Sequence, residues 1–574
     1  MMSKTYTFLP YAQRPGEKCG LIAHVLSLFR WLMPGLVLGL LLPGQLEAVS
    51  FEKISRGLKS IRQERIRARL KFLSSSHFKG RATGSPEAEL TAAYIASVFE
   101  ANGLLPAPHS TDFIHSFGIS RALPRNSGRL EFTMNDGSVV SFESGDDFLP
   151  ASWGPDASVQ GKQAVFVGYG LTAPHLDYDD FRGIELQDRV AIMLSGVPPD
   201  IAFRRVGTTD YSDPVEKSLQ AASRGACGVV LILAAGDELP SPGSDFGHAR
   251  AHLSDRLDSL SVPVVRMTFA AGERLLGQAG GAETPSPSLG LLQDGIDRAG
   301  RPRSFPLQGR MRMQVSYRRR QLQGYNVMGH IPGSDPVLKN EFIILGAHHD
   351  HMGVDETGRI FYGADDNASG ITALLELSEA FQDNPAKPRR SILLAAWGGE
   401  EIGLMGSRHY VRAPPVPLQE TVAMLQMDMI GRNAQHAANL VGELPGQRAE
   451  DNRNSLNIFG ASVAPMLREF IERSNARAGL DLRFPAEAKS MDLMRRSDHW
   501  PFLKRGIPAL FLFTGFHPDY HRATDTSNKI NFNKLEKILK LVYLAVWEVG
   551  EARRRPQLDP GGFGRLTHRG PAGE

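Results

Sequence analysis

Five short clusters of acidic and histidine residues stand out in the C-terminal half of the chain. They are His348-His349-Asp350-His351, Asp365-Asp366-Asn367, Glu400-Glu401, Asp428 between two methionines, and the segment from His517 to Thr526. Adjacent carboxylates repel each other unless cations neutralise them, and an acid flanked by methionines is hard to explain as ordinary surface. Imidazole and carboxylate ligands without cysteine suit zinc, with cobalt or manganese as substitutes. Carboxylates that can bridge predict two metal ions, about 3.5–4 Å apart.

The first cluster offers two pairs of side chains. Residues two apart on an extended strand point the same way, so His348 could act with Asp350, or His349 with His351. In the first pair His348 would be a metal ligand and Asp350 would fix the orientation of its ring. Spacing alone does not choose between the two pairs, and a polar loop is the ordinary explanation for any single histidine.

The other clusters also have ordinary explanations when each is taken alone. Asp365-Asp366-Asn367 could cap a helix, and Glu400-Glu401 could be two solvated loop acids. In the last cluster either His517 or His521 could be a ligand, and the proline after His517 makes that residue suitable for a turn. The occurrence of all five clusters after successive predicted strands favours a single site.

A regular alternation of strands and helices would position these clusters. Apolar runs predict strands at 342–347, 391–396, 421–427, 456–459 and 509–513. Helical spacing of apolar residues predicts helices at 369–381, 404–411, 463–478 and 532–549. This alternation predicts an α/β fold whose mostly parallel mixed sheet is flanked by helices. Active sites in such sheets lie beyond the carboxyl ends of the strands.

The rest of the chain divides by its composition. Residues 53–102 have helical patterns, whereas 158–284 hold short β-rich runs that predict a separate compact α/β module. Residues 280–303 are rich in Gly, Pro and Ser and are expected to form a linker or an exposed loop. Residues 553–574 have little apolar content and are expected to form a disordered tail.

Composition excludes several classes of protein. The 574 residues, 42% hydrophobic and 22% charged, are typical of a globular protein with two or more domains. A net charge of +3 gives no reason to expect nucleic acid or acidic membranes as partners. With two cysteines, Cys19 and Cys227, a disulfide framework is excluded.

The N-terminal segment resembles an export signal. Lys18 and Arg30 precede an apolar run at 31–42, and 45–48 could be a cleavage region. The segment predicts an exported protein, periplasmic or secreted, and an uncleaved membrane anchor is the alternative.

Taken together, the clusters resemble the motifs of the zinc exopeptidases that include bacterial and fungal leucyl aminopeptidases, aminopeptidase Y, glutamate carboxypeptidase and glutaminyl cyclase. The motifs that carry the resemblance are His348-His349-Asp350, the stretches 363–370 and 399–403, Met427-Asp428-Met429, and Tyr520-His521. The resemblance covers about 65–549, and 80–85 is similar to the opening segment of the family.

The resemblance implies five ligands for two Zn²⁺ ions: His348, Asp365, Glu401, Asp428 and His521. Asp365 would bridge both ions, often with a cis peptide to Asp366. Glu401 and His521 would complete one site, and Asp428 and His348 the other.

The resemblance also implies two catalytic residues. Glu400 would be the general base that takes a proton from the water between the metals, and Asp350 would orient His348. His349, where many relatives have a residue that is not a ligand, is a departure from the pattern. Ser497-Asp498-His499 also matches a family pattern and is expected to support the pocket.

The β-rich region resembles a protease-associated domain inserted within the peptidase domain, through the motifs 168–171 and 178–181. The expected organisation is an export signal or anchor at 1–48, the N-terminal part of the peptidase domain at 53–150, the inserted domain at 155–300, the catalytic zinc peptidase domain at 320–552, and the tail at 553–574.

The leading hypothesis for function is an aminopeptidase that removes N-terminal residues from peptides. A carboxypeptidase or dipeptidase would need a cation to hold a terminal carboxylate, and Arg432, Arg495 and Arg496 keep that alternative open. Glutaminyl cyclase activity is a further alternative that uses one zinc. A non-catalytic receptor on the same fold is disfavoured because every ligand position is filled.

Overall fold

The computed structural model describes residues 50–124, 128–151, 153–173, 177–198, 213–239, 260–278, 288–355, 357–435, 448–485 and 491–562. The expected export signal at 1–48 and most of the expected tail lie outside these residues. Residues 553–562 are described, and the Asp559 N–H donates to the carbonyl oxygen of Val463 at 2.8 Å. Among the described helices, none combines the length and the apolar character needed to span a membrane.

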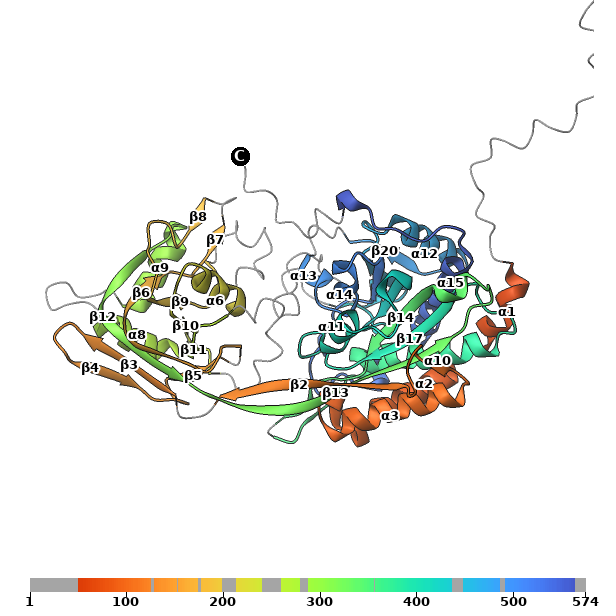
Figure 1. Cartoon of the computed structure of the whole chain (residues 1–574), viewed down its shortest axis with the longest axis horizontal. Helices are drawn as coiled ribbons and strands as arrows, with labels where there is room; N and C mark the ends of the chain where they lie inside the picture. The colour runs from red at the N-terminus through yellow and green to blue at the C-terminus, as the bar shows by residue number, and fades with distance from the viewer. Residues whose placement is uncertain are drawn as a thin grey trace, which may run out of the picture. The chain divides into compact units, whose positions relative to one another are not determined.

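The first of two large sheets contains nine strands and has the order β1-β13-β17-β14-β18-β21-β19-β20, with β2 also paired to β13 (Figure 1). The strands are β1 (Leu105–Pro106), β2 (Ile114–Pro124), β13 (Tyr317–Ile331), β14 (Phe342–His348), β17 (Ser391–Trp397), β18 (Thr421–Met427), β19 (Ser455–Phe459), β20 (Asp481–Arg483) and β21 (Ala509–Phe513). The four strands β17, β14, β18 and β21 are mutually parallel, and antiparallel pairs flank them. The predicted mixed, mostly parallel sheet is confirmed.

Side chains of the central strands alternate between two hydrophobic cores. In β14, Ile343 and Leu345 pack into one core, whereas Phe342 and Ile344 pack into the other. Because every residue of β14 is buried, both faces of the sheet must be covered. This explains why the strand sequences are continuous apolar runs rather than alternating patterns.

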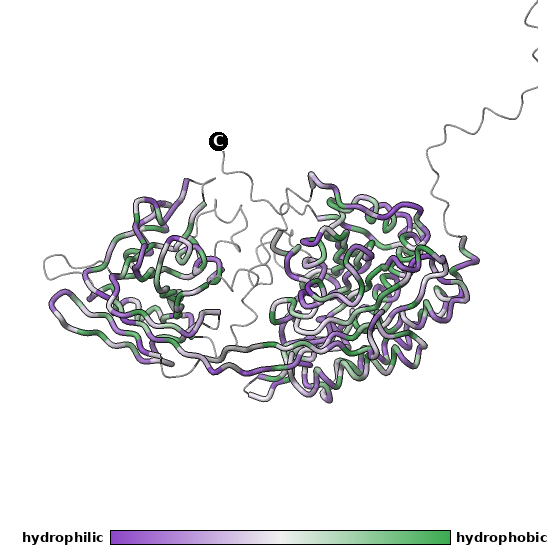
Figure 2. The backbone as a smooth tube through the Cα atoms, viewed as in Figure 1, coloured by the Kyte–Doolittle hydropathy of each residue, from purple (hydrophilic) through white to green (hydrophobic). Residues whose placement is uncertain are grey.

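Helices from both ends of the chain cover these faces. Those that contribute to the core of Ile343 are α1 (Phe51–Ser60), α2 (Gln63–Leu73), α3 (Pro86–Ala101), α10 (Gly370–Asp383), α12 (Pro465–Ala478) and α15 (Phe532–Glu551). Those that contribute to the other core are α11 (Met405–Arg412), α13 (Met491–Met494) and α14 (His499–Lys504). Hydrophilic and hydrophobic stretches alternate along the covering helices, as expected for amphipathic elements (Figure 2).

The second sheet contains eight strands in the order β4-β3-β12-β6-β9-β10-β11-β5 (Figure 1). They are β3 (Arg129–Met134), β4 (Val139–Phe142), β5 (Phe148–Pro150), β6 (Ala157–Val167), β9 (Val190–Leu194), β10 (Gly228–Ile232), β11 (Val264–Met267) and β12 (Ser304–Val315). The helices α6 (Pro214–Ser223), α8 (Phe269–Gln278) and α9 (Leu289–Ala299) belong to the same part of the chain. Two short hairpins, β7 (Thr172–Ala173) with β8 (Tyr178–Asp179) and β15 (Gly353–Val354) with β16 (Ile360–Phe361), complete the strands.

Two sequence-based expectations need correction here. The second sheet includes β3, β4 and β5, which lie within 53–150, and β12, which lies beyond 300, so it is larger than the range 155–300. Part of the expected linker at 280–303 forms α9, which Ser288 caps by accepting a hydrogen bond from the Leu291 N–H. Leu289, Leu292 and Ile296 of this helix are buried, and their spacing is the signal that the Gly- and Ser-rich composition concealed.

Strands β2 and β13 carry the chain out of the first sheet and back. They pair antiparallel from Ile114 opposite Val327 to Pro124 opposite Tyr317. The second sheet lies between them in sequence, so it is an insertion into the polypeptide that builds the first sheet.

A buried lysine holds strand ends together in the inserted sheet. The Lys217 side chain on α6 is 1% exposed, and its ammonium group donates to the carbonyl oxygens of Tyr169, Leu194 and Gly196 at 2.6, 3.0 and 2.5 Å. Burial lowers the pKa of Lys217 to about 7, although the charges of Asp180 and Asp213 oppose this shift.

Replacement of Lys217 by methionine is expected to destabilise the inserted sheet by about 3 kcal/mol, because three buried carbonyl groups lose a charged donor. Denaturant unfolding followed by circular dichroism would measure this loss. Lys162 pairs with Asp188 at an exposed position of the same sheet, and the matched Lys162→Met change should have almost no effect. Equal effects of the two substitutions would contradict the prediction.

Candidate metal centre

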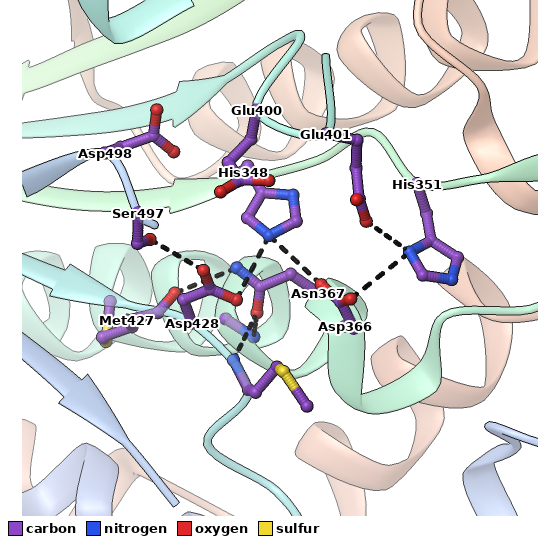
Figure 3. A network of polar contacts seen from close by, with 12 residues as sticks. His348, His351, Asp366, Asn367, Glu400, Glu401, Met427, Asp428, Ser497 and Asp498 are labelled. Atoms are coloured by element: carbon purple, nitrogen blue, oxygen red, sulfur yellow. Dashed lines mark hydrogen bonds and ion pairs between the residues drawn. The ribbon is translucent and has the colours of Figure 1, made fainter. Parts of the chain in front are cut away.

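The predicted clusters meet at the carboxyl edge of the four parallel strands (Figure 3). Strand β14 ends at His348, and Asp428 directly follows β18. Glu400 comes three residues after the end of β17, and His521 lies in the segment after β21. The turn Ala364–Ser369 before α10 supplies Asp366. The sheet topology therefore brings together residues that are far apart in sequence, as the α/β pattern predicts.

Two overlapping groups of side chains could each hold a metal ion. The first consists of His348, Glu400 and Asp428, and the second of His348, Asp366 and Glu401; within each group the ligand atoms lie within 4.8 Å of one another. His348 Nε2 is 3.2 Å from Asp428 Oδ1 and 3.3 Å from Asp366 Oδ1.

Asp366 lies between His348 and His521. Its Oδ1 faces His348, and its Oδ2 lies 3.2 Å from His521 Nε2. His521 Nε2 is also 3.1 Å from Glu401 Oε2. A carboxylate with one oxygen toward each of two histidines has the arrangement that bridging two cations requires.

Asp365 does not lie between His348 and His521 but contacts Gly431 and His517. Its Oδ1 accepts a hydrogen bond of 2.6 Å from the Gly431 N–H, and its Oδ2 is 3.3 Å from His517 Nε2. The cis peptide joins Asp366 to Asn367 rather than Asp365 to Asp366. The structure thus places Asp366, not Asp365, at the shared position, which corrects the sequence-based choice by one residue. The turn has non-helical φ and ψ angles at Asp366 and Asn367, so a helical or strand periodicity could not assign the directions of its side chains.

The Asp350 carboxylate binds the backbone of the two glutamates. Its Oδ1 accepts a hydrogen bond from the Glu400 N–H at 3.1 Å, and its Oδ2 accepts one from the Glu401 N–H at 3.3 Å. His348 Nδ1 is 3.8 Å from Asp350 Oδ1 and 3.2 Å from the Asp350 carbonyl oxygen. Asp350 therefore connects the histidine loop to the glutamate turn, a link to the glutamates that spacing did not suggest.

The alternative pair of the first cluster, His349 and His351, does not act together. His349 faces away from the candidate ligands, and His351 contacts them. His349 Nε2 lies 2.8 Å from the carbonyl oxygen of Tyr325. His351 Nδ1 lies 2.7 Å from Glu401 Oε1 and 3.7 Å from Asp366 Oδ2. The sequence singled out His351 only as a partner of His349, and its actual partner, Glu401, lies on another strand end (Figure 3).

Hydrogen bonds hold the other carboxylates in place. The Ser497 hydroxyl donates to Asp428 Oδ2 at 2.7 Å, which agrees with the expected supporting role of Ser497-Asp498-His499 (Figure 3). Asn367 donates from its side-chain amide to the Met427 carbonyl oxygen at 3.0 Å and accepts from the Met429 N–H at 3.3 Å. Asn367 thus fastens the turn that carries Asp366 to the end of β18.

Crowding of charges shifts the pKa values of the cluster. Burial opposes protonation of His521, but the charge of Glu401 and hydrogen bonds to Asp366 and Glu401 outweigh it and raise the pKa of His521 to about 10. Burial likewise opposes protonation of His348, but Asp428 and Glu400 raise its pKa well above the usual value. Burial raises the pKa of Glu400 well above its usual value, and the charge of His348 opposes this shift. The raised pKa values of the two histidines thus reflect the carboxylates crowded around them.

Arg432 is already paired. Its guanidinium lies 2.8 Å from Asp519 Oδ2 and 3.6 Å from Asp525 Oδ1, and its side chain is 11% exposed. Among the other residues considered from sequence, His517 lies against Asp365, and His409 stacks on Phe117. Neither histidine lies in the two groups of potential ligands among the described residues.

The donor set fits zinc. Each group offers imidazole nitrogen and carboxylate oxygen, with no cysteine, and His348 and Asp366 are almost completely buried. Buried carboxylates at this density are costly unless cations neutralise them. These atoms therefore form a candidate centre for zinc, or for a related divalent ion.

Part of the chain is similar in sequence to known peptidases. Residues 326–546 match the sequence model of peptidase family M28. The chain is 27% identical over 248 residues to leupeptin-inactivating enzyme 1 of Streptomyces exfoliatus, covering 40% of this chain and 49% of that protein. It is 26% identical over 225 residues to aminopeptidase YwaD of Bacillus subtilis, covering 38% of this chain and 43% of that protein. The matches thus span about half of the length of these relatives or less.

Two solved structures share the fold over most of the chain. One is an aminopeptidase from Aneurinibacillus sp. strain AM-1, with a TM-score of 0.54 and 22% identity, covering 89% of this chain and 98% of that one. The other is a zinc aminopeptidase from Bacillus subtilis, with a TM-score of 0.51 and 18% identity, covering 86% of this chain and 96% of that one.

Proposed function

Because residues 326–546 match the sequence model of peptidase family M28, we propose that this chain is a zinc-dependent aminopeptidase. The observation that carries the proposal is the position of Asp366, whose two carboxylate oxygens face His348 on one side and His521 on the other. This geometry supports a centre for two zinc ions rather than one, because each oxygen of Asp366 can serve a separate ion.

We assign His348, Asp428 and Asp366 to one ion, and Asp366, Glu401 and His521 to the other. When bound, the ions would act as Lewis acids that polarise the scissile carbonyl group and lower the pKa of water. Asp350 would hold the Glu400-Glu401 turn in place through its two hydrogen bonds to the backbone. It would also limit rotation of the His348 ring, which lies 3.8 Å away.

Glu400 is the proposed general base. No described hydrogen bond engages its carboxylate, whereas Glu401 contacts both His351 and His521. The carboxylate of Glu400 lies within 4.8 Å of the ligand atoms of His348 and Asp428, which is close enough to serve a water at the same site. Glu400 would accept a proton from the attacking water and deliver it to the leaving amine.

The charges around the centre favour a free α-amine over a carboxylate as the recognised end of the substrate. Carboxylates dominate the site, and Arg432, one of the cations that could hold a terminal carboxylate, is bound to Asp519. Arg496 lies on the Phe516 ring at 6.0 Å and keeps a carboxypeptidase or dipeptidase as the second candidate. Glutaminyl cyclase activity is less well supported, because it would leave one group of ligands without a role.

Blocked peptides separate these activities. We expect the purified protein to bind two zinc ions and to hydrolyse peptides with a blocked C-terminus but not those with a blocked N-terminus. Metal analysis by mass spectrometry and chromatography of the cleaved peptides would measure both properties. Cleavage of N-blocked peptides alone would establish the carboxypeptidase instead, and absence of bound zinc would overturn the proposal.

Zinc affinity is expected to rise with pH between about 6 and 9, because zinc must displace the protons of His348 and His521. Both histidines have raised pKa values in the metal-free protein, that of His521 being about 10. Protons that stabilise the metal-free cluster at neutral pH are released on binding, so higher pH favours the zinc-bound form. Titration calorimetry in buffers of different ionisation enthalpy would count these protons. A zinc affinity independent of pH would contradict the prediction.

Two further features of the chain belong to the proposal. The inserted sheet is proposed to be a protease-associated domain, on the strength of the motifs at 168–171 and 178–181. Export through the N-terminal segment is also proposed from the charge and hydropathy of residues 18–48, with an uncleaved anchor as the alternative. Sequencing of the N-terminus of protein recovered from each cellular fraction would test both the export and the cleavage.

A further inference from the structure

A segment that precedes the inserted sheet reaches the candidate metal centre. Thr83 and Asp350 are 267 residues apart in the chain, yet the Thr83 hydroxyl donates to Asp350 Oδ2 at 2.6 Å. Arg81 makes similarly distant contacts. We propose that Arg81 and Thr83 are positioning residues of the zinc centre, which fix the loops that carry its ligands. This inference rests on the proposed function.

Arg81 joins two of the ligand-bearing loops. Its side chain is 1% exposed and has no carboxylate partner among its hydrogen bonds. Nε donates to the His349 carbonyl oxygen at 2.9 Å, and one terminal nitrogen donates to the Gly363 carbonyl oxygen at 2.9 Å. The other terminal nitrogen donates to the carbonyl oxygens of Leu73 and Tyr362 at 2.8 and 2.9 Å.

Two of the accepting carbonyl groups belong to the segments that carry candidate metal ligands. His349 stands between His348 and Asp350, and Gly363 begins the turn that presents Asp366. A single planar guanidinium therefore sets the distance between the loop of His348 and the turn of Asp366. His348 and Asp366 belong to one group of potential ligands, so a change in that distance would alter the geometry of the centre directly.

The backbone around Arg81 is shaped for close contact with these loops. The Arg81 carbonyl oxygen accepts a hydrogen bond from the His351 N–H at 3.2 Å. Arg81 has a φ of 53° and Gly80 a φ of 70°, both in the left-handed region. A Cβ atom on Gly80 would lie 2.4 Å from the carbonyl oxygens of Gly353 and Phe361, so only glycine allows this approach.

Thr83 acts on the other side of the centre, through Asp350. The same carboxylate that accepts from Thr83 also accepts from the backbone of Glu400 and Glu401. Loss of the Thr83 hydroxyl would leave Asp350 freer to turn and would loosen the glutamate pair. The region that matches the peptidase family begins at 326, so both positioning residues lie outside it.

The test uses the full-length protein and measures zinc affinity by competition with a chelator. Thr83→Val is expected to weaken zinc binding about tenfold. Thr83→Ser keeps the hydroxyl and is expected to bind zinc as tightly as the wild type. Arg81→Lys, which keeps the charge but lacks the planar set of donors, is expected to weaken binding by about 10- to 100-fold. The visible spectrum of the cobalt-substituted variants should change as well, because it reports ligand geometry.

Arg390 provides the matched control. It is also 1% exposed, and it donates to Glu341 Oε2 at 2.6 Å and to the carbonyl oxygens of Val549 and Ala552 at 3.0 and 2.6 Å. None of these partners is a candidate ligand. Arg390→Lys should lower the thermal stability of the protein and leave zinc affinity and the cobalt spectrum unchanged.

The outcomes distinguish this inference from the proposed function. Wild-type protein that binds no zinc would overturn both. A zinc-binding wild type whose Thr83→Val variant has unchanged zinc affinity and an unchanged cobalt spectrum would overturn the inference alone. If Arg81→Lys does not fold, the comparison of Thr83→Val with Thr83→Ser decides the question.

Discussion

Replacement of Glu400 by glutamine is expected to leave zinc bound and to lower kcat by about two to four orders of magnitude. Glutamine fills the same volume but cannot accept a proton, so the attacking water loses its base. The zinc ligands assigned above do not include Glu400. The hydrogen bond from its backbone N–H to Asp350 is unaffected by the change of side chain. Steady-state kinetics together with metal analysis would measure the two properties separately.

Glu401→Gln provides the contrast for Glu400→Gln. Glu401 contacts His521 at 3.1 Å and His351 at 2.7 Å, and it is an assigned ligand, so this variant should lose zinc as well as activity. If Glu400→Gln also lost its zinc, or kept wild-type turnover, the assignment of Glu400 as the base would be wrong.

Replacement of Asp366 by asparagine is expected to remove at least one zinc ion and to weaken binding of the other about 100-fold or more. The carboxylate of Asp366 is the one that faces both His348 and His521, and the amide carries no negative charge and has only one acceptor oxygen. Metal analysis after dialysis, followed by titration with zinc, would give the stoichiometry and the affinity.

The adjacent Asp365→Asn change is the matched control. An asparagine can still accept the hydrogen bond from the Gly431 N–H, so zinc affinity should fall by no more than about tenfold. The opposite ranking of the two variants would restore Asp365 as the bridging residue and would contradict the geometry of the turn.

The central elements of the first sheet were predictable because each has a strong local signal. The predicted strands at 342–347, 391–396 and 421–427 differ from β14, β17 and β18 by at most one residue. The long helix predicted at 532–549 matches α15 within two residues. Continuous apolar runs between turn residues mark strands that are buried on both faces, and their alternation with helices determines the parallel order.

The extent of the inserted sheet was less predictable because its pairings are long-range. Strand β12 pairs with β3 and with β6, at least 137 residues earlier in the chain, and no local pattern reveals such partners. Residues 129–150 were therefore grouped with the helices that precede them, although their strands pair in the second sheet.

The site shows the same distinction between local and long-range information. Clusters at strand ends were visible in the sequence, whereas the direction of each side chain depended on backbone angles. Asp365 and Asp366 differ only in their places within a non-helical turn, and the resemblance did not settle that register. Arg81 gave no signal of its function because its partners are backbone carbonyl groups, which any residue type can provide.

The packing of the first helices against the last one sets an order of events during synthesis. The Tyr543 hydroxyl on α15 donates to the Ile54 carbonyl oxygen on α1, across 489 residues of sequence. The N-terminal helices therefore leave the ribosome long before their packing partner exists, whereas all strands of the inserted sheet are available once residue 315 has been made. The inserted sheet can assemble first, and the core that contains Ile343 closes only after α15 has been made. The hydrolytic activity proposed for the metal centre would thereby be delayed until α15 has been made.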